Sequence, residues 1–558
     1  MSLYKENYKL WCENPVFDED TKKELLALTD EKEIEERFYK NLEFGTAGLR
    51  GIMGAGTNRM NIYTVGKATL GLTLYLKEQF PNATEKGVVI AYDTRNNSPL
   101  FARCAADVLT ATGIPVYLFD KPVPTPCLSF AVPHFGCVSG IVITASHNPP
   151  AYNGYKAYDE TGCQLGPDAA KKVLNLMDTL SWEDIPQKGD DTLLTIIGDE
   201  TIDCFTNTIL RQATLDDRKA KEDLNLVYTP IHGTGLLPVT QILEKDGFRR
   251  VTVVEAQCTP DGNFPTVKSP NPEERGALEM GIEKAKEIGA DLVIGTDPDA
   301  DRIGCAVSHK GEMLLLSGNQ VGALLVDFLL QNRTVLGENP TVISTIVTGD
   351  LGKYRAEADG CRVEQVLTGF RFIGNKITAY ETARAEGNHS APHILIGFEE
   401  SYGYLIGTHA RDKDAVVTAM LIAEMAAFHK KEGRTLMGAL EALYDKYGYF
   451  SDKVESITLQ GKEGLEQISA IMAKLRAMPC FLPNTVKTLD FEKGLDGLPP
   501  ANVLKAYVEG GSWVAARPSG TEPKIEFYYS IRAKNAQEAE SLFKALRENV
   551  RRAAGLPT

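Results

Sequence analysis

The chain has 558 residues, of which 43% are hydrophobic and 24% are charged, and its formal net charge is −15. It is too long for a single core, so we expect about three to four domains, and the composition is typical of a soluble globular enzyme. The acidic balance excludes the broad basic face that binds nucleic acid. An anionic substrate would therefore be held by a local cluster of basic side chains, backbone N–H groups and metal.

The cysteines and the N-terminal segment indicate a cytoplasmic location. The ten cysteines form no CxxC pair and have no regular spacing, so we expect reduced thiols. Residues 1–14 are charged and lack the apolar core of a signal peptide, and no apolar run approaches the length of a membrane span. We therefore expect no membrane partner and no nucleic-acid partner.

The first part of the chain predicts an N-terminal arm followed by an α/β domain. Residues 1–40 are expected to form two short polar helices, the second of which begins after Asp30. Beyond them, helical patterns alternate with apolar runs that predict strands. The expected helices cover 65–80 and 99–112, and the expected strands cover 87–92, 115–119 and 140–143. This rhythm indicates a mixed or mainly parallel sheet covered by helices.

The same rhythm recurs twice and then changes. Further strands are expected at 224–228, 250–254, 291–296, 341–347, 362–366 and 393–396. After residue 450 the pattern is that of an α+β domain, with strands at 454–459, 514–517 and 524–532 and helices at 464–477 and 536–552. We predict an arm at 1–40 and four domains at 41–205, 206–322, 323–450 and 451–558.

One candidate site is the segment Thr144–Pro149, which contains Ser146 and His147. It ends an apolar strand, so the serine should be displayed on a turn where a substrate can reach it. Taken alone, a Ser-His pair is better interpreted as a capped turn with a solvated serine. A Ser-His hydrolase is disfavoured because neighbouring side chains on an extended segment point apart and no GxSxG sequence surrounds the serine.

A second candidate is the acidic run that follows the expected strand at 291–296. Asp297, Asp299 and Asp301 alternate along the chain, and this spacing can turn three carboxylates toward one point. Carboxylates that lie so near one another repel, so a cation is expected between them. Oxygen ligands favour a hard ion such as Mg²⁺. A solvated acidic turn is the alternative for this run alone, and the distal glutamate of an EF-hand is missing.

Two further segments carry polar groups suited to a sugar phosphate. Residues 397–403 place Glu399 and Ser401 after a strand, where they could bind sugar hydroxyls or form a helix cap. Residues 517–524 join two expected strands and contain Arg517, a fork of donors, beside hydroxyls and a glycine. That combination is typical of a phosphate-binding turn.

These four segments, in this order, resemble the α-D-phosphohexomutases, the phosphoglucomutase and phosphomannomutase superfamily. The resemblance extends over nearly the whole chain after residue 40. It implies three similar mixed-sheet α/β domains and a C-terminal α+β domain of the TATA-box-binding-protein-like type, arranged around a central cleft. The length of the chain and the segment Leu42–Gly51 are most similar to the longer phosphoglucomutase-like subgroup.

The resemblance also implies a role for each matching residue. Ser146 would be the phosphorylated serine and, with Asp297, Asp299 and Asp301, would bind one Mg²⁺. The residues implied around the transferring phosphate are Arg50, His147, Lys156, Arg302 and Lys413, the last of which is linked to proton transfer. Those implied to bind substrate are Thr368, Gly369, Arg371, Glu399, Ser401, Arg517, Ser519, Gly520 and Thr521. Arg371 stands where many members have lysine, so its contact is a departure from the family pattern.

The implied reaction is the interconversion of glucose 1-phosphate and glucose 6-phosphate through phosphoserine and glucose 1,6-bisphosphate. Mannose phosphate and pentose phosphates are the alternative substrates within the family. A metal-dependent sugar phosphatase and a catalytically silent sugar-phosphate-binding protein are the alternatives outside it. The expected partners are small sugar phosphates, and the expected assembly is a monomer or a weak homo-oligomer.

Overall fold

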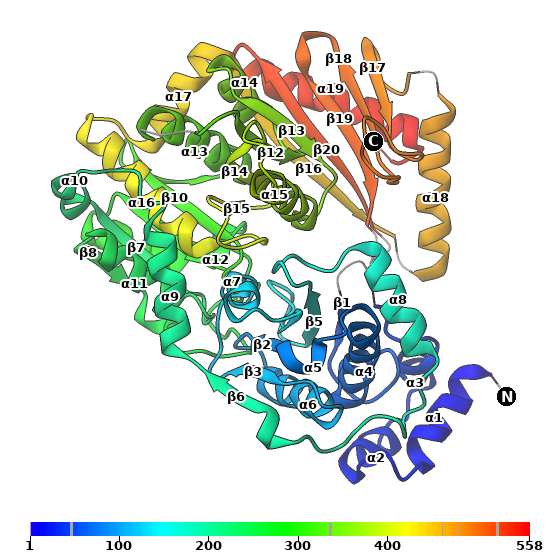
Figure 1. Ribbon diagram of the computed structural model, residues 1–558. Coiled ribbons are helices and arrows are strands. Elements are labelled where there is room, and N and C mark those ends of the chain that lie inside the picture. The colour runs from blue at the N-terminus through cyan, green and yellow to red at the C-terminus, as the bar shows by residue number, and fades with distance from the viewer. Residues whose placement is uncertain are drawn as a thin grey trace.

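The computed structural model describes residues 2–44, 48–333, 337–459, 461–478, 480–519 and 524–557. Within this part of the chain four sheets follow one another in sequence, with six, five, four and five strands (Figure 1). The first three are mixed sheets with helices on their faces, and the fourth is antiparallel. The predicted fold class is therefore confirmed, whereas the domain boundaries at 205, 322 and 450 stay a prediction.

The described residues of the N-terminal arm form three helices, so the prediction of two helices is wrong. They are α1 (Leu3–Glu13), α2 (Glu19–Leu26) and α3 (Glu31–Phe38). Asp18 and Asp30 cap the N-termini of α2 and α3 by accepting a backbone N–H bond. Only the cap at Asp30 was apparent from the sequence.

An aromatic cluster attaches the arm to the first sheet domain. Trp11 of α1 is 0% exposed and stacks on Phe17 with ring centroids 4.2 Å apart. It also meets Tyr63 and Trp182, which belong to the first sheet domain, at 5.5 and 5.1 Å. Burial of several large aromatic side chains contributes several kcal/mol of stability, on the order of 2 kcal/mol each. The arm is therefore packed against the body of the protein.

The first sheet, sheet I, has the strand order β1-β5-β4-β2-β3-β6. Its strands are β1 (Gly48–Ile52), β2 (Val88–Tyr92), β3 (Val116–Phe119), β4 (Ser139–Ile143), β5 (Tyr152–Tyr158) and β6 (Leu194–Ile197). The strands β4, β2, β3 and β6 are parallel, and β5 is antiparallel to both β4 and β1. Its helices are α4 (Ile62–Gln79), α5 (Ala83–Lys86), α6 (Ser98–Ala111), α7 (Thr125–Phe135) and α8 (Pro167–Asp178).

Both faces of sheet I are buried, which explains its continuous apolar strands. Every residue of β2 is buried. Val88 and Ile90 pack with α4, α6 and α8, whereas Val89 and Ala91 pack on the opposite side with α7. Side chains alternate between the two faces of a strand, so a strand covered by helices on both sides reads as an unbroken hydrophobic run.

The second sheet, sheet II, has the order β11-β10-β9-β7-β8. Its strands are β7 (Asn225–Thr229), β8 (Arg250–Val253), β9 (Leu292–Thr296), β10 (Ile303–His309) and β11 (Glu312–Leu316). The three strands β9, β7 and β8 are parallel, and β10 is antiparallel to β9. The helices of this region are α9 (Asp199–Leu210), α10 (Arg218–Asp223), α11 (Leu236–Asp246) and α12 (Arg275–Ile288).

The third sheet, sheet III, repeats this arrangement in the order β13-β12-β14-β15. Its strands are β12 (Pro340–Thr345), β13 (Arg362–Val366), β14 (His393–Glu399) and β15 (Gly403–Leu405). Again three strands are parallel, and β15 is antiparallel to β14. Its helices are α13 (Gly318–Asn332), α14 (Leu351–Ala358), α15 (Phe370–Ala385), α16 (Ala415–Lys431) and α17 (Leu436–Tyr447). The apolar run 324–330 lies in α13.

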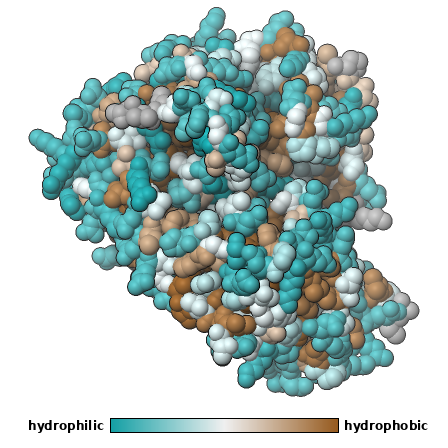
Figure 2. All heavy atoms as spheres, in the orientation of Figure 1, coloured by the Kyte–Doolittle hydropathy of each residue, from teal (hydrophilic) through white to brown (hydrophobic). Residues whose placement is uncertain are grey.

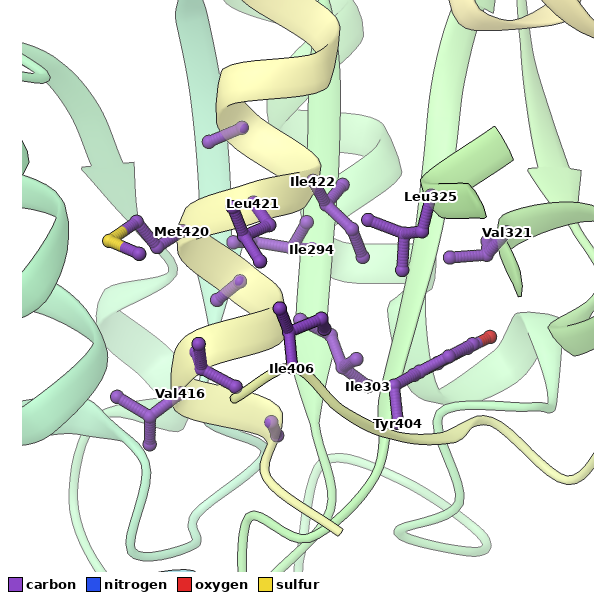
Figure 3. Close-up of a cluster of buried hydrophobic side chains, with 14 of the residues drawn as sticks. Ile294, Ile303, Val321, Leu325, Tyr404, Ile406, Val416, Met420, Leu421 and Ile422 are labelled. Carbon is purple, nitrogen blue, oxygen red and sulfur yellow. The ribbon is translucent and has the colours of Figure 1, made fainter. Parts of the chain in front are cut away.

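Helix α16 joins the cores of sheets II and III. In Figure 3 its side chains Val416, Met420, Leu421 and Ile422 lie among residues of both regions. The neighbours labelled there are Ile294 and Ile303 of β9 and β10, Val321 and Leu325 of α13, Tyr404 of β15, and Ile406 just beyond it. Fourteen of the 17 residues of α16 are buried, so this helix is hydrophobic on nearly all sides.

The fourth sheet, sheet IV, is antiparallel in the order β16-β20-β19-β18-β17. Its strands are β16 (Tyr449–Thr458), β17 (Thr485–Asp490), β18 (Leu504–Val508), β19 (Trp513–Pro518) and β20 (Lys524–Ala533). Helices α18 (Gly461–Ala477) and α19 (Ala536–Ala554) pack on one face. The other face meets the loop after β12, where Trp513 packs with Ile346 and Val347.

The surface in Figure 2 is mostly hydrophilic, and its larger apolar patches lie over the lower part of the view, where Figure 1 places sheet I. Among the described residues, every helix is too short or too polar to cross a membrane.

We expect Trp11→Ala to lower the free energy of unfolding by about 3–5 kcal/mol, because it empties the centre of the aromatic cluster. Urea unfolding followed by far-ultraviolet circular dichroism measures this change, and limited proteolysis reports release of the arm. Leu26→Ala is the control, since that side chain is 68% exposed, and it should change stability by less than about 0.5 kcal/mol. Equal effects of the two substitutions would contradict the packing role of the cluster.

Candidate active site

Ser146 lies just beyond β4, in a backbone turn that the sequence did not predict in detail. Its φ of 50° places it in the left-handed region, which few residues other than glycine adopt. The Ser146 N–H donates to Thr144 Oγ1 at 2.8 Å, and the Thr144 hydroxyl donates to Asp93 Oδ2 at 2.7 Å. The side chain is 3% exposed, so the serine is held inside a cavity and is less accessible than expected.

The serine turn is fixed from behind by Arg95, which the sequence analysis missed. Its buried guanidinium donates to the carbonyl oxygens of Ser146 and Asn148, and to those of Pro149 and Tyr152 at 3.0 Å each. Asp93 lies 3.3 Å from Arg95 Nε and balances its charge. Five N–H donors in one rigid fork suit this task, because they can hold several carbonyl groups of one turn at once.

His147 lies beside the serine, which corrects one sequence-based expectation. Its Nδ1 is 3.3 Å from Ser146 Oγ, whereas neighbouring side chains were expected to point apart. The left-handed backbone at Ser146 brings the two side chains together, and the expectation held only for an extended segment. Burial, with help from Arg302 and Arg50, lowers the pKa of His147 well below its usual range, so the ring is neutral at neutral pH.

The three aspartates lie together just beyond β9, as expected. Their carboxylates are buried, and one oxygen from each lies within 4.8 Å of the others. Asp297 Oδ2 accepts the Ser146 hydroxyl at 2.7 Å, across a separation of 151 residues. Asp297 Oδ1 accepts the backbone N–H groups of Asp301 and Arg302 at 3.1 and 2.9 Å. The serine of sheet I therefore touches the acidic cluster of sheet II directly.

Two lysines balance this buried negative charge. Lys156 of β5 donates to Asp299 Oδ2 at 3.1 Å and lies 3.5 Å from Asp301 Oδ2. Lys413 Nζ lies 3.0 Å from Asp301 Oδ2 and 2.9 Å from Asp412 Oδ1. Burial alone would raise the pKa of Asp299, but the Lys156 ammonium lowers it below its usual range. Burial, followed by the charges of Asp299 and Asp301, raises the pKa of Asp297 well above its usual range.

The cluster can hold a metal ion, and its oxygen atoms fit that role. Asp299 Oδ1 and Asp301 Oδ1 are buried and have no hydrogen-bond partner in the described part of the chain. Buried polar atoms are normally paired, so two unpaired carboxylate oxygens in one cluster are suited to bind a cation. All donors are oxygens, which is the ligand type that hard divalent ions prefer.

A cavity of about 480 Å³ opens onto Ser146. Its described walls include the predicted residues Arg50, Lys156, Asp301, Arg302 and Lys413. Arg50 Nη1 donates to Asn148 Oδ1 at 3.3 Å. The arm also contributes to the wall through α3 and the chain just after it, a role that the sequence did not reveal.

The predicted sugar-binding segment lies next to this cluster. Glu399 ends β14, and its Oε1 accepts the Gly369 N–H at 2.9 Å, so two predicted substrate-binding segments meet. The charge of Glu399 raises the pKa of both Lys413 and Arg302, after the larger contributions of nearer carboxylates. Ser401 follows in a half-buried turn.

Gly403 leaves space for the Lys413 side chain beside β15. A Cβ at Gly403 would lie 2.2 Å from Lys413 Cδ and 3.6 Å from Glu399 Oε2. The absence of a side chain there lets the lysine stem pass over β15 to reach Asp301. Of the other predicted substrate contacts, Thr368 precedes Gly369, and Arg371 lies on α15 with its guanidinium 4.8 Å from the centre of the Phe372 ring.

The predicted phosphate turn belongs to sheet IV. Arg517 is the next-to-last residue of β19, and its Nη1 lies 3.3 Å from the Tyr528 hydroxyl and 3.5 Å from Glu526 Oε2. The Ser519 N–H donates to Lys524 O at 2.7 Å, which closes the turn. Gly520 and Thr521 lie outside the described residues. Arg517 and Ser519 are not among the described walls of the cavity, whereas Arg50, Ser146, Lys156, Asp301, Arg302 and Lys413 are.

Two further polar residues complete the cluster, and the sequence analysis missed both. The Thr125 hydroxyl, at the start of α7, donates to Asp299 Oδ2 at 2.8 Å. Asp412 accepts the Tyr158 hydroxyl and the Gln164 amide at 2.8 Å each while it holds Lys413. Asp412 could have been found as an acidic neighbour of a predicted site lysine, whereas Thr125 carries no local signal.

Three family descriptions match successive parts of the chain. They are the phosphoglucomutase/phosphomannomutase alpha/beta/alpha domain I at residues 41–184, domain II at 203–311 and domain III at 317–447. A phosphoglucomutase of Staphylococcus haemolyticus is 37% identical over 531 residues, which cover 90% of this chain and 93% of that protein.

Two solved structures share the fold. The open form of parafusin, a phosphoglucomutase of Paramecium, has a TM-score of 0.70 at 15% identity and covers 93% of this chain and 96% of its own. An N-acetylphosphoglucosamine mutase of Aspergillus fumigatus, in complex with GlcNAc-6P and magnesium, has a TM-score of 0.51 at 14% identity. It covers 92% of this chain and 96% of its own.

We expect Arg95→Lys to loosen the serine turn, because one ammonium cannot replace a guanidinium that holds four carbonyl oxygens. Amide hydrogen exchange over residues 146–152 should accelerate by about tenfold or more, given the strength of hydrogen bonds to charged groups. Arg103→Lys is the control, since that side chain is 45% exposed and forms ion pairs with Asp107 and Asp191, away from the serine turn. Unchanged exchange in the Arg95 variant would show that the turn holds its shape without the fork.

Proposed function

Because this chain belongs to the phosphoglucomutase/phosphomannomutase family, we propose that it interconverts glucose 1-phosphate and glucose 6-phosphate through a phosphoserine and glucose 1,6-bisphosphate. The family makes it a phosphohexomutase, an intramolecular phosphotransferase of the isomerase class. The observation that carries the proposal is the 2.7 Å contact between Ser146 Oγ and Asp297, inside a cavity lined by basic side chains.

We assign the metal as one Mg²⁺, held by Asp297, Asp299, Asp301 and an oxygen of the group on Ser146. The donor set of carboxylate and phosphate oxygens supports this choice. Magnesium in the Aspergillus fumigatus mutase of the same fold is consistent with it. When bound, the ion would stabilise negative charge on the phosphoryl group as its bond breaks.

In the first half of the reaction the phosphorylated Ser146 is the donor. The bond between Oγ and phosphorus breaks, and a bond forms between phosphorus and a free hydroxyl oxygen of the hexose monophosphate. The sugar hydroxyl loses its proton and Ser146 Oγ gains one, so the number of bound protons is unchanged. His147, with Nδ1 3.3 Å from that oxygen, is placed to exchange this proton. Lys156, Arg302 and Lys413 supply positive charge around the phosphoryl group.

In the second half the bisphosphate turns over and returns its other phosphoryl group to Ser146. The sugar must then be held in two opposite orientations. Glu399 and Ser401 can grip ring hydroxyls in either orientation, and the turn with Arg517 and Ser519 can hold the phosphate that is not reacting. Thr368, Gly369 and Arg371 would shape the sugar site beside Glu399. Closure of sheet IV over the cleft would keep the intermediate from water.

The sugar is assigned from the family resemblance, with mannose phosphate and pentose phosphates as the alternatives. Small sugar phosphates are the proposed partners, and the cytoplasm is the proposed location. A metal-dependent phosphatase would use the same aspartates. The contact between Ser146 and Asp297 favours a phosphorylated enzyme over direct attack by water.

We expect Ser146→Ala to lower mutase turnover by at least about a thousandfold, because the phosphoryl carrier is lost. Conversion of glucose 1-phosphate, primed with glucose 1,6-bisphosphate and coupled to oxidation of glucose 6-phosphate, measures it. Ser308→Ala, in β10 away from the cavity, is the control and should retain activity. Full activity of the Ser146 variant would remove this residue from its role.

We expect Asp299→Asn to weaken Mg²⁺ binding by tenfold or more, since it removes a buried charged ligand. Isothermal titration with MgCl₂ measures binding directly and does not depend on turnover. Asp445→Asn on the exposed side of α17 is the matched control. The assignment of this cluster as the metal site fails if both variants bind the ion as tightly as the wild type.

We expect turnover to be highest with glucose 1-phosphate when it is compared with mannose 1-phosphate and ribose 1-phosphate under one set of conditions. Intact mass spectrometry should show a fraction of chains heavier by one phosphate, and Ser146→Ala should abolish that fraction. Steady release of inorganic phosphate without isomerisation would instead identify a phosphatase.

A further inference from the structure

A second cavity, of about 290 Å³, lies among helices α13, α14, α16 and α17. We call it the helical cavity, and its polar walls include Asp327, His429, Arg434, Lys446 and Tyr447. His429 lies 16 residues beyond Lys413, near the far end of α16. Helix α16 begins at Ala415, 14 residues before His429, and a helix rises 1.5 Å per residue, so roughly 21 Å of helix separate His429 from the chain beside Lys413. The helical cavity is therefore distinct from the catalytic cluster.

His429 is the first sign that the helical cavity receives a ligand. The side chain is 1% exposed, and both of its ring nitrogens are buried without a hydrogen-bond partner in the described part of the chain. Burial, with the charge of Arg434, lowers the pKa of His429 to about 4, so the ring is neutral. A neutral ring offers one donor and one acceptor, which together suit a hydroxyl group. Buried polar groups are rarely left unpaired.

Other groups inside the helical cavity have the same mixed character. The Tyr447 hydroxyl is also buried without a partner among the described residues. Asp327 offers a buried carboxylate whose Oδ1 accepts Arg355 Nε at 2.5 Å and whose Oδ2 accepts the Gln331 amide at 2.6 Å. Carboxylate oxygens have further lone pairs, so Asp327 can accept an additional hydroxyl. Donors and acceptors placed side by side are typical of a site for a polyhydroxylated molecule.

The rim of the helical cavity is cationic. Arg434 and Lys446 are exposed, and within the described ranges neither forms an ion pair with a carboxylate. Lys446 lies in the last turn of α17, where a basic side chain also complements the helix dipole. Arg434 lies between α16 and α17, where it has no such role. Two available cations beside a site for hydroxyl groups suit a phosphate ester.

We infer that the helical cavity is a second, noncatalytic binding site for a phosphorylated monosaccharide. The inner groups, His429, Asp327 and Tyr447, bind the sugar hydroxyls, and Arg434 and Lys446 bind the phosphate. The volume lies at the lower end of the range for small-molecule sites, which suits one sugar ring with its phosphate. The inference does not depend on the proposed reaction, because occupancy can be measured at His429 itself.

The test is nuclear magnetic resonance of full-length protein labelled with ¹⁵N in its eight histidines. The His429 signal is assigned from its absence in His429→Gln, and that variant serves no other purpose. Glucose 6-phosphate, glucose, inorganic phosphate and sodium chloride at matched ionic strength are titrated separately. We expect glucose 6-phosphate to shift the His429 signal to saturation, at concentrations where glucose and inorganic phosphate leave it unchanged.

The test variant combines Arg434→Gln and Lys446→Gln in one protein. Lys431→Gln is its matched control. Lys431 is exposed on the same helix and pairs with Asp217 outside the cavity. The double variant should weaken the response to glucose 6-phosphate by about tenfold or more, because two charge-assisted bonds are lost, while the control should respond as the wild type does. The inference is overturned if the His429 signal does not move, if sodium chloride or inorganic phosphate moves it equally, or if both variants respond alike. Catalytic turnover does not enter this test.

Discussion

The site depends on the constraint that three buried carboxylates cannot share one small volume without positive charge. Asp297, Asp299 and Asp301 are buried, and one carboxylate oxygen of each lies within 4.8 Å of the others. Water screens the repulsion between buried charges poorly. Lys156 and Lys413 meet that need, and they come from different parts of the fold. In the part of the chain that the structure describes, one oxygen on each of Asp299 and Asp301 remains without a hydrogen-bond partner, so the cluster can still bind a metal ion.

The three mixed sheets deliver their polar groups by the same topology. In each sheet one parallel strand lies beside an antiparallel neighbour, and these strands are β4, β9 and β14. Ser146 and Asp297 follow β4 and β9, and Glu399 ends β14. Ligand sites in open α/β sheets lie at the carboxyl ends of strands, so three sheets packed around one point can bring three such ends together. Helix α16 fixes part of this arrangement, because its buried sides bind sheet II to sheet III (Figure 3).

The sequence predicted the central strands and several of the residues that lie together at the candidate site, because both have local signatures. Unbroken apolar runs such as 88–92 indicate strands covered on two sides, and the aspartates alternate beside one another in the chain. Strand β5 was not predicted, although it carries Lys156, because asparagine, glycine and lysine interrupt its apolar pattern and its neighbours provide the burial. Arg95 was missed for a similar reason: its partners are carbonyl groups more than 50 residues away, and a backbone carbonyl has no sequence signature.

The contact between sheets III and IV links the two regions in which sugar binding and phosphate binding are proposed. The Lys505 ammonium of sheet IV donates a hydrogen bond to Ile346 O, in the loop after β12, at 2.7 Å. The same segment of chain supplies Thr345 and Thr348, whose hydroxyls donate to Glu400 at 3.0 and 3.2 Å, directly beside Glu399. Displacement of sheet IV would therefore pull on the loop that holds Glu400, the neighbour of the glutamate proposed to bind the sugar. A proposed reaction that needs two orientations of one sugar gains from this link, because the grip on the ring and the grip on the distant phosphate share one support.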